Sequence, residues 1–180
     1  MKKRILLGAG ASAALHKACD LASKLAQEGH EVKCVLTPRA AELVSPQLFE
    51  ALTGEPAWVD EFGKSRRHGM DHIQLSQWTQ VLCIAPASAD LVSRLSLGLA
   101  NDLLTTVALA LAPGVPRVVC PAMNEHMLSS PPIVRHLQTL RKDGWRILEP
   151  GQGHLACGIE GPGRLSEPAE IAAFLLEVLG

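Results

Sequence analysis

Residues 81–85 (VLCIA), with residues 86–90 (PASAD) directly after them, decide the fold class. Every residue of the first segment is apolar, and a strand of that kind is buried on both faces of its sheet. Small and polar residues then follow, which is typical of the carboxyl end of a parallel strand that leads into a helix. Residues 5–7 (ILL), which end in glycine, have the same character and predict another strand buried on both faces.

Apolar runs of strand length alternate with stretches of helical period along the chain. Further strands are predicted at residues 32–36, 115–120 and 145–148, and helical patterns lie at residues 12–28, 87–112, 130–142 and 167–179. Within 87–112 a second helix opens near Asn101 or Asp102. The alternation predicts an α/β fold with a doubly wound parallel sheet, a three-layer arrangement of flavodoxin or Rossmann type. We expect one domain, from residue 4 to residue 180.

The composition excludes several other classes of protein. The chain has 180 residues, 47% of them hydrophobic, and a net charge of −1, which excludes a basic nucleic-acid footprint. No apolar run reaches the roughly 18 residues that span a bilayer. The five cysteines are scattered and form no CxxC motif, which predicts reduced, cytoplasmic thiols. His68 and His72 have HxxxH spacing, but Gly69 stands where a zinc protease has Glu, so no metal is expected.

Small and polar residues follow the predicted strands, where ligands of such sheets bind. Residues 8–14 (GAGASAA) let backbone N–H groups approach a phosphate, or form a tight turn with Ser12 as helix cap. Thr37 follows the second strand, where its hydroxyl can bind a phosphate or a flavin. Ser88 and Asp90 follow the third strand, where they either cap the next helix or hold an anion with the exposed amides.

Two later segments carry further candidate chemistry. Asn124, in residues 121–127 (PAMNEHM), can donate to a carboxylate or serve as a turn residue above packed methionines. Residues 151–164 contain five glycines around Cys157, which predicts either a flap over a site or a flexible connection. Small residues flank Cys157, so its thiol could be accessible and reactive. The charged stretch 59–70 lacks periodicity, and we expect a mobile loop there.

In this order the segments resemble one family, the homo-oligomeric flavin-containing cysteine decarboxylases. The matching pieces are residues 8–14, 72–75 (HIQL) followed by Trp78, 86–90, 100–104 (ANDLL), 121–124 with Met127, and 155–158 (LACG). The resemblance extends over about residues 4–179. It implies an FMN-binding protein that assembles as a homotrimer with the flavin at a subunit interface, and bacterial relatives often stack trimers into dodecamers.

The resemblance also implies a role for each matching residue. His72 matches the catalytic histidine, Asn124 the residue that holds the substrate carboxylate, and Cys157 the acid of a closing flap. Cofactor contacts are implied at Gly10, Ala11, Ser12, Thr37, Ser88, Ala89, Asp90 and Ala122. Substrate contacts are implied at Asn124, Met127, His154 and Ala156.

The implied reaction is the FMN-dependent decarboxylation of 4′-phosphopantothenoylcysteine (PPC) to 4′-phosphopantetheine, a step of coenzyme A biosynthesis. Oxidation of the cysteine thiol to a thioaldehyde creates an acceptor for the electrons that carbon dioxide leaves behind, and the resulting enethiol is then reduced. Because the sequence ends at Gly180, a separate synthetase is expected to make the substrate. No nucleic acid or membrane is expected as a partner.

Three alternatives stay open. A peptidyl-cysteine decarboxylase of the same family would stop at the enethiol, and Cys157 argues against it. A flavin prenyltransferase of similar fold would need neither Asn124 in this setting nor the loop around Cys157. A non-catalytic flavin-binding regulatory protein usually carries an acidic tail, which this sequence lacks, so an enzyme is favoured.

Overall fold

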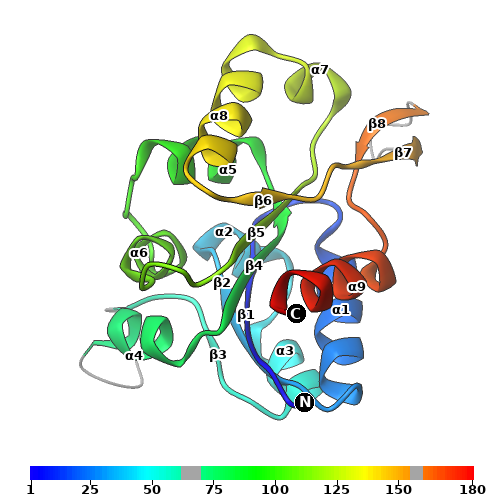
Figure 1. Ribbon diagram of the computed structural model, residues 1–180. Coiled ribbons are helices and arrows are strands. Elements are labelled where there is room, and N and C mark those ends of the chain that lie inside the picture. The colour runs from blue at the N-terminus through cyan, green and yellow to red at the C-terminus, as the bar shows by residue number, and fades with distance from the viewer. Residues whose placement is uncertain (62–69, 155–159) are drawn as a thin grey trace.

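Six parallel strands form the central sheet of the protein, for which a computed structural model describes residues 1–61, 70–154 and 160–180. In sheet order they are β3 (Ala57–Trp58), β2 (Glu31–Leu36), β1 (Arg4–Ala9), β4 (Val81–Ala87), β5 (Arg117–Pro121) and β6 (Arg146–Ile147) (Figure 1). This is the Rossmann order, and it reverses direction between β1 and β4. The predicted doubly wound parallel sheet is confirmed.

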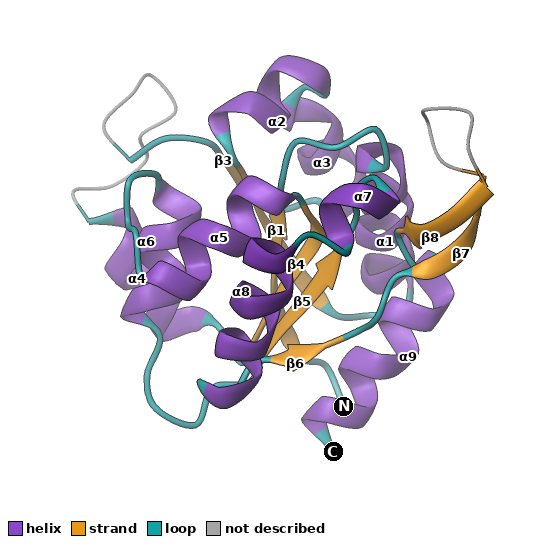
Figure 2. Cartoon of the chain, turned by 90° about the horizontal axis from the view of Figure 1, so that it is seen from above, coloured by secondary structure: helices purple, strands orange, loops and turns teal. Residues whose placement is uncertain are grey.

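Helices cover both faces of this sheet, which gives the molecule three layers (Figure 2). On one face lie α1 (Leu15–Gln27), α3 (Pro46–Thr53) and α9 (Pro168–Leu179). On the other lie α4 (Asp71–Trp78), α5 (Ala89–Leu97), α6 (Leu103–Ala110) and α8 (Pro131–Lys142). The short helices α2 (Pro38–Leu43) and α7 (Glu125–Leu128) follow soon after β2 and β5.

Strand β1 shows why the protein has two hydrophobic cores. Ile5 and Leu7 belong to the core that contains α1 and α9, whereas Leu6 belongs to the core that contains α5 and α6. Successive side chains of a strand point to opposite faces of the sheet, and all three of these are fully buried. Every residue of β4 is buried as well. The prediction that these two strands are covered on both faces is therefore confirmed.

Helix α4, which contains His72, was not among the helices predicted from the sequence. It begins at Asp71 and buries Asp71, Leu75 and Ser76. Two of these three buried residues are polar, so the helix shows no apolar period in the sequence. The short helices α2 and α3 were also not predicted, although Thr37 and Ser45 cap them and a proline follows each cap. That combination is a recognisable start signal for a helix.

The described part of the glycine-rich segment 151–164 forms an antiparallel hairpin, with β7 (Gly151–His154) and β8 (Glu160–Arg164). The hairpin projects from the body of the fold near α7 (Figure 2). Gly163 has a φ of +124°, and a Cβ there would overlap the carbonyl oxygen of Met123. Only glycine permits this approach, which lets the Met123 N–H donate to the Gly163 carbonyl at 3.0 Å. The hairpin is thus fastened to the segment that follows β5.

Candidate active site

A cavity of about 480 Å³ lies beyond the carboxyl ends of β1, β2 and β4, where the strand order reverses. Its volume falls in the range of small-molecule and cofactor sites, about 300–1,000 Å³. Six of the predicted site residues line it together: Ala11, Thr37, Ser88, Ala89, Asp90 and Met127. Pro38, Arg39, Arg94, Asn101 and Asp102 complete the lining. The structure therefore gathers residues from five separate segments around one space.

Three hydroxyls at the strand ends share one hydrogen-bonding arrangement. Each oxygen accepts a backbone N–H of the turn that follows, at 3.2 Å for Ser12 and Thr37 and at 3.3 Å for Ser88. Within the described part of the chain, none of the three hydroxyl protons has an acceptor. A serine or threonine hydroxyl can accept and donate at once, so each of these keeps a donor for a ligand. Thr37 and Ser88 present theirs at the cavity wall.

The same bonds decide which of these residues cap helices. Ser88 caps α5, as predicted, and Thr37 caps α2. Of the two alternatives for residues 8–14, the one with Ser12 as helix cap is not found, because α1 begins at Leu15 with Ala14 in the cap position. The Ser12 hydroxyl instead accepts the N–H of Ala14 in the turn before the helix.

The backbones of the first turn and of β4 meet at the cavity without a side chain between them. The Gly10 N–H donates to the Pro86 carbonyl at 2.9 Å, and a Cβ at Gly10 would lie 2.7 Å from that oxygen. Ala122, at the end of β5, donates its N–H to the Ala87 carbonyl at 3.0 Å. Gly10 and Ala122 therefore fix how the strand ends come together, although neither residue lines the cavity.

Arg94 carries a charge that is already paired inside the cavity wall. Its Nε donates to the Asp90 carboxylate at 3.1 Å, and its Nη1 donates to Asn101 at 2.9 Å and to Asp102 at 2.5 Å. Burial alone would lower the pKa of the Arg94 guanidinium, but the hydrogen bond and charge of Asp102, with those of Asp90, raise it. Asp102 also caps α6 by accepting the Thr105 N–H at 2.8 Å, so Arg94 joins the starts of α5 and α6.

Arg39 differs from Arg94, since it has no hydrogen-bond or ion-pair partner among the described residues. It lies in the first turn of α2, after Thr37 and Pro38, and is exposed where it lines the cavity. A free guanidinium binds phosphate or carboxylate through two parallel N–H donors. Arg39 was not among the site residues predicted from the sequence, although the segment Thr37-Pro38-Arg39 directly after a predicted strand could have indicated it.

Asn124 lies in a segment that reaches from the hairpin to the cavity. Its Oδ1 accepts the N–H of His126 at 2.8 Å and so caps α7, while Met127 at the other end of this helix lines the cavity. Gly161 of β8 faces the start of α7 so closely that a Cβ there would lie 2.6 Å from the Glu125 carboxylate. Asn124 itself does not line the cavity. It directly precedes the helix that contacts the hairpin through Glu125 and the cavity through Met127.

His72 does not line the cavity of its own chain. It lies in the first turn of α4, where its Nδ1 is hydrogen-bonded to the carboxylate of Glu61. Helix α4 packs against α6, whose cap Asp102 belongs to the cavity wall. The His72 side chain is 24% exposed, and its Nε2 has no partner in the part of the chain that the structure describes.

Two predicted residues, Ala156 and Cys157, lie outside the described residues, as do His68 and most of the predicted loop 59–70; His154 ends β7. The other four cysteines are buried and free, as predicted for reduced thiols. Burial raises the pKa of the Cys34 thiol, and a hydrogen bond to Cys120 together with burial raises that of Cys83. Such thiols are poor nucleophiles. In the described ranges no three metal-ligating side chains gather, and no helix is long and apolar enough to cross a membrane.

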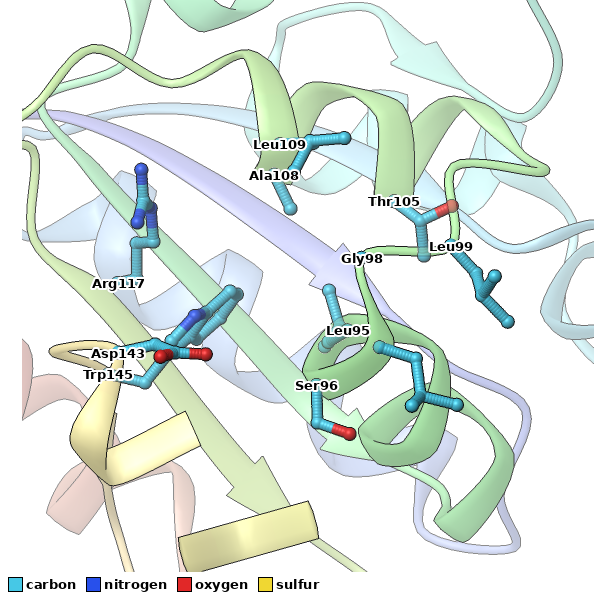
Figure 3. A pocket seen from close by; sticks show the side chains of 11 residues that line it. Leu95, Ser96, Gly98, Leu99, Thr105, Ala108, Leu109, Arg117, Asp143 and Trp145 are labelled. Carbon is cyan, nitrogen blue, oxygen red and sulfur yellow. The ribbon is translucent and has the colours of Figure 1, made fainter. Parts of the chain in front are cut away.

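A second cavity of about 280 Å³ lies between α5, α6 and the residues after α8 (Figure 3). None of the predicted site residues lines it. Its rim carries three exposed leucines, Leu97, Leu99 and Leu109, and its wall includes the buried Trp145. The hydroxyl of Ser96 donates to the Ser93 carbonyl at 2.9 Å. Polar groups share this cavity with the leucines: Arg117 and Asp143 line it, and the buried Nε of Arg117 has no hydrogen-bond partner among the described residues.

The strand order and the cavity at its reversal define an α/β protein built to hold a nucleotide-like or similar ligand beyond its strand ends. Sequence comparison is more specific, because the profile of the Flavoprotein family matches residues 1–180. The chain belongs to the Flavoprotein family.

Curated relatives include the coenzyme A biosynthesis bifunctional proteins CoaBC. That of Bacillus subtilis (strain 168) is 39% identical over 169 residues, which cover 94% of this chain and 41% of the relative. That of Mycolicibacterium smegmatis is 39% identical over 179 residues, which cover 98% of this chain and 42% of the relative. The chain thus spans less than half the length of these relatives.

Similar solved structures cover nearly the whole chain. A PPC decarboxylase mutant complexed with pantothenoylaminoethenethiol has a TM-score of 0.86 at 31% identity, over 98% of both chains. The FMN-dependent cysteine decarboxylase SpaF has a TM-score of 0.82 at 32% identity, over 99% of this chain and 98% of its own. The FMN-binding protein AtHal3 has a TM-score of 0.85 at 31% identity, over 98% of this chain and 96% of its own.

Proposed function

We propose that this chain is an FMN-dependent decarboxylase that converts PPC to 4′-phosphopantetheine in coenzyme A biosynthesis. The observation that carries the proposal is the cavity at the switch point, with unused hydroxyl donors and one unpaired cation in its wall. The CoaBC relatives and the PPC decarboxylase structure support this reaction over others of the family.

The cavity suits FMN in size and in donor chemistry. Thr37 and Ser88 would donate their hydroxyl protons, the turn from Gly10 to Ser12 would approach the phosphate with its backbone, and Ala89, Asp90 and Ala122 would frame the ring. Arg39 would pair with a phosphate, a group that both FMN and PPC carry. When bound, FMN supplies the two-electron oxidation of the substrate's thiol end and returns those electrons after carbon dioxide has left.

The protein's own residues would orient the substrate and move protons. Asn124 would hold the substrate carboxylate by hydrogen bonds alone. A full positive charge at this place would stabilise the ground-state carboxylate and oppose the loss of carbon dioxide. His72 would accept or donate a proton at that stage, since an imidazole suits proton transfer near neutral pH. Met127, His154 and Ala156 would contact the substrate, and Cys157 would supply the last proton.

The position of His72 supports an assembly in which the site is shared. His72 lies outside its own cavity with Nε2 open, so we propose a homotrimer in which each histidine serves the FMN site of a neighbouring subunit. Leu97, Leu99 and Leu109 are 61%, 50% and 62% exposed and offer apolar surface for contact with another chain. Stacked trimers would give a dodecamer. A cytoplasmic location completes the proposal.

The deciding experiment incubates the purified, FMN-loaded protein with PPC and measures carbon dioxide release together with 4′-phosphopantetheine formation. We expect both, and we expect His72→Asn to keep FMN bound while abolishing turnover. His30→Asn is the matched control. The His30 ring accepts the backbone N–H of Lys3 at 3.3 Å, at the amino-terminal ends of β1 and β2 and so away from the cavity. No carbon dioxide from a yellow, FMN-loaded protein would leave the non-catalytic flavin-binding protein as the better account.

A peptide that ends in cysteine tests the rival substrate in the same assay. We expect the peptide to react far more slowly than PPC, because it offers no phosphate to Arg39. Faster release of carbon dioxide from the peptide, with accumulation of an enethiol, would favour the peptidyl-cysteine decarboxylase instead.

A further inference from the structure

The Glu61 carboxylate is the group that holds the His72 ring in the described structure. Glu61 lies just beyond β3, eleven residues before His72 in the sequence, and is 8% exposed. Its Oε1 is hydrogen-bonded to Nδ1 of His72. A carboxylate buried to this extent needs a partner, and the imidazole is the partner that the structure provides.

An ionised carboxylate can only accept hydrogen bonds, so Nδ1 of His72 must carry a proton. In the neutral ring this leaves Nε2 without a hydrogen, as a proton acceptor, and in the charged ring Nε2 becomes a donor. The nitrogen that is left to hydrogen-bond with a ligand is therefore Nε2, the atom that has no partner among the described residues. A carboxylate that selects the tautomer in this way also fixes the ring orientation.

We propose that Glu61 is a positioning residue for the decarboxylation, which holds His72 in the Nδ1–H tautomer so that Nε2 faces outward to the reacting ligand. The inference rests on the proposed function of His72 and adds a group that the sequence motifs did not include. Glu61 is not among the residues that line the cavity, so it would act through the histidine.

The surroundings of the pair favour a role for this one carboxylate. Helix α6, which packs against α4, has no charged residue from Leu103 to Ala110. Lys33 of β2 lies over the rings of Trp58 and Trp78, at 5.7 and 4.4 Å from their centroids, and not on Glu61. Asp60 and Asp71 are sequence neighbours of the pair and have interactions of their own. No cation of the described residues competes with His72 for Glu61.

The test compares Glu61→Gln with Glu61→Asp in the FMN-loaded protein. Glutamine keeps the volume and removes the charge that requires a proton on Nδ1, whereas aspartate keeps the charge on a shorter arm. The first readout is the ¹⁵N spectrum of histidine-labelled protein, which distinguishes the two ring tautomers without any substrate. We expect the His72 signals to show the Nδ1–H form in the unmodified protein, a mixture with the Nε2–H form in Glu61→Gln, and partial restoration in Glu61→Asp.

The second readout is the kinetics with PPC. We expect Glu61→Gln to lower kcat by about 10- to 100-fold, the size of loss seen when a group that orients a functional histidine is removed, and to leave KM within about twofold. Glu55→Gln is the control, since Glu55 lies in the same region, just before β3, and has no contact with His72. FMN absorbance should be unchanged in all variants.

Each outcome decides something. An unchanged tautomer in Glu61→Gln would overturn the proposal, and so would a changed tautomer with full kcat. If the unmodified protein releases no carbon dioxide from PPC while the tautomer still responds to Glu61→Gln, the proposed function fails and the control of His72 by Glu61 stands. If His72→Asn keeps full activity, the catalytic use of the pair is excluded in the same series.

Discussion

Two cavities in the described part of the molecule differ in how their polar groups are used. At the switch point, the hydroxyls of Thr37 and Ser88 accept backbone N–H groups but keep their own protons, and Arg39 has no partner among the described residues. In the cavity between α5, α6 and the residues after α8, the Ser96 hydroxyl donates to a backbone carbonyl and leucines form the rim. Among the described residues, the second cavity also keeps one unused donor, the buried Nε of Arg117, so the first is marked as a ligand site by its several donors together with its place at the switch point.

The largest effect that would sharpen this contrast is expected at Trp145. This side chain is 8% exposed in the wall of the second cavity, and it packs in the core with Ile133 and Leu140. Truncation of a buried tryptophan costs about 3–5 kcal/mol, so Trp145→Ala should lower the free energy of unfolding by that amount. The dissociation constant for FMN should stay the same once the protein is folded. Leu48→Ala, at an exposed leucine of α3 that lines neither cavity, should change the stability by less than about 0.5 kcal/mol.

Gly10→Ala should act on both stability and ligand binding, because the glycine stands where two backbones meet at the first cavity. The added Cβ would lie 2.7 Å from the Pro86 carbonyl and 2.9 Å from Leu91, so the strand ends must separate. We expect a loss of about 1–3 kcal/mol in thermal or denaturant unfolding and weaker FMN binding. Gly151→Ala is the control, since its Cβ would meet nothing closer than 3.9 Å. Equal behaviour of the two variants would contradict the close approach.

Arg39→Gln removes a cation of the first cavity that has no partner among the described residues, and it should leave the fold intact. A charged hydrogen bond to phosphate contributes about 1.5–3 kcal/mol, so a roughly tenfold or greater loss of affinity is expected. A rise in the dissociation constant for FMN would assign the arginine to the cofactor, and a rise in KM for PPC alone would assign it to the substrate. Arg135→Gln, on exposed α8, is the control. If neither constant moves, Arg39 is not a phosphate contact.

The smallest effect is expected from a comparison of two serines that each cap the N-terminus of a helix. Ser88 caps α5 beside the cavity, and Ser45 caps α3 away from it, with acceptor distances of 3.3 Å in both. Loss of either cap should cost about 1 kcal/mol of stability. Only Ser88→Ala should also weaken FMN binding, which a visible titration would measure. A similar affinity for FMN in both variants would remove Ser88 from the ligand site.

The sequence predicted the sheet because residues 5–7 and 81–85 are apolar throughout, and burial on both faces leaves that pattern. It also located much of the cavity, since ligands of such sheets bind where the strands end. Helix α4 escaped prediction because Asp71 and Ser76 are buried polar residues, so the segment shows no apolar period. The hairpin escaped it because residues 151–164 are rich in glycine and do not alternate.

The distribution of charge in the site could not be predicted from the sequence. Arg39 and Arg94 are the same residue type, so the sequence does not distinguish them. Only the fold places Asp90, Asn101 and Asp102 around Arg94. The partnership of Glu61 with His72 was equally hidden, since it joins the end of one loop to the start of an unpredicted helix. The sequence placed His72 in the site by resemblance, whereas the structure places it outside the cavity of its own chain.

The hydroxyls of Thr37 and Ser88 join the backbone of two helices to whatever occupies the cavity. A ligand that accepts their protons polarises the oxygens, and each oxygen then becomes a stronger acceptor for the N–H behind it. Occupancy should therefore reach the first turns of α2 and α5 and slow the exchange of those amide protons with solvent. A ligand at 100 times its dissociation constant adds about 2.7 kcal/mol to the stability of the folded state. The hydroxyl oxygens of Thr37 and Ser88 thus cap helices α2 and α5 and at the same time line the edge of the binding site.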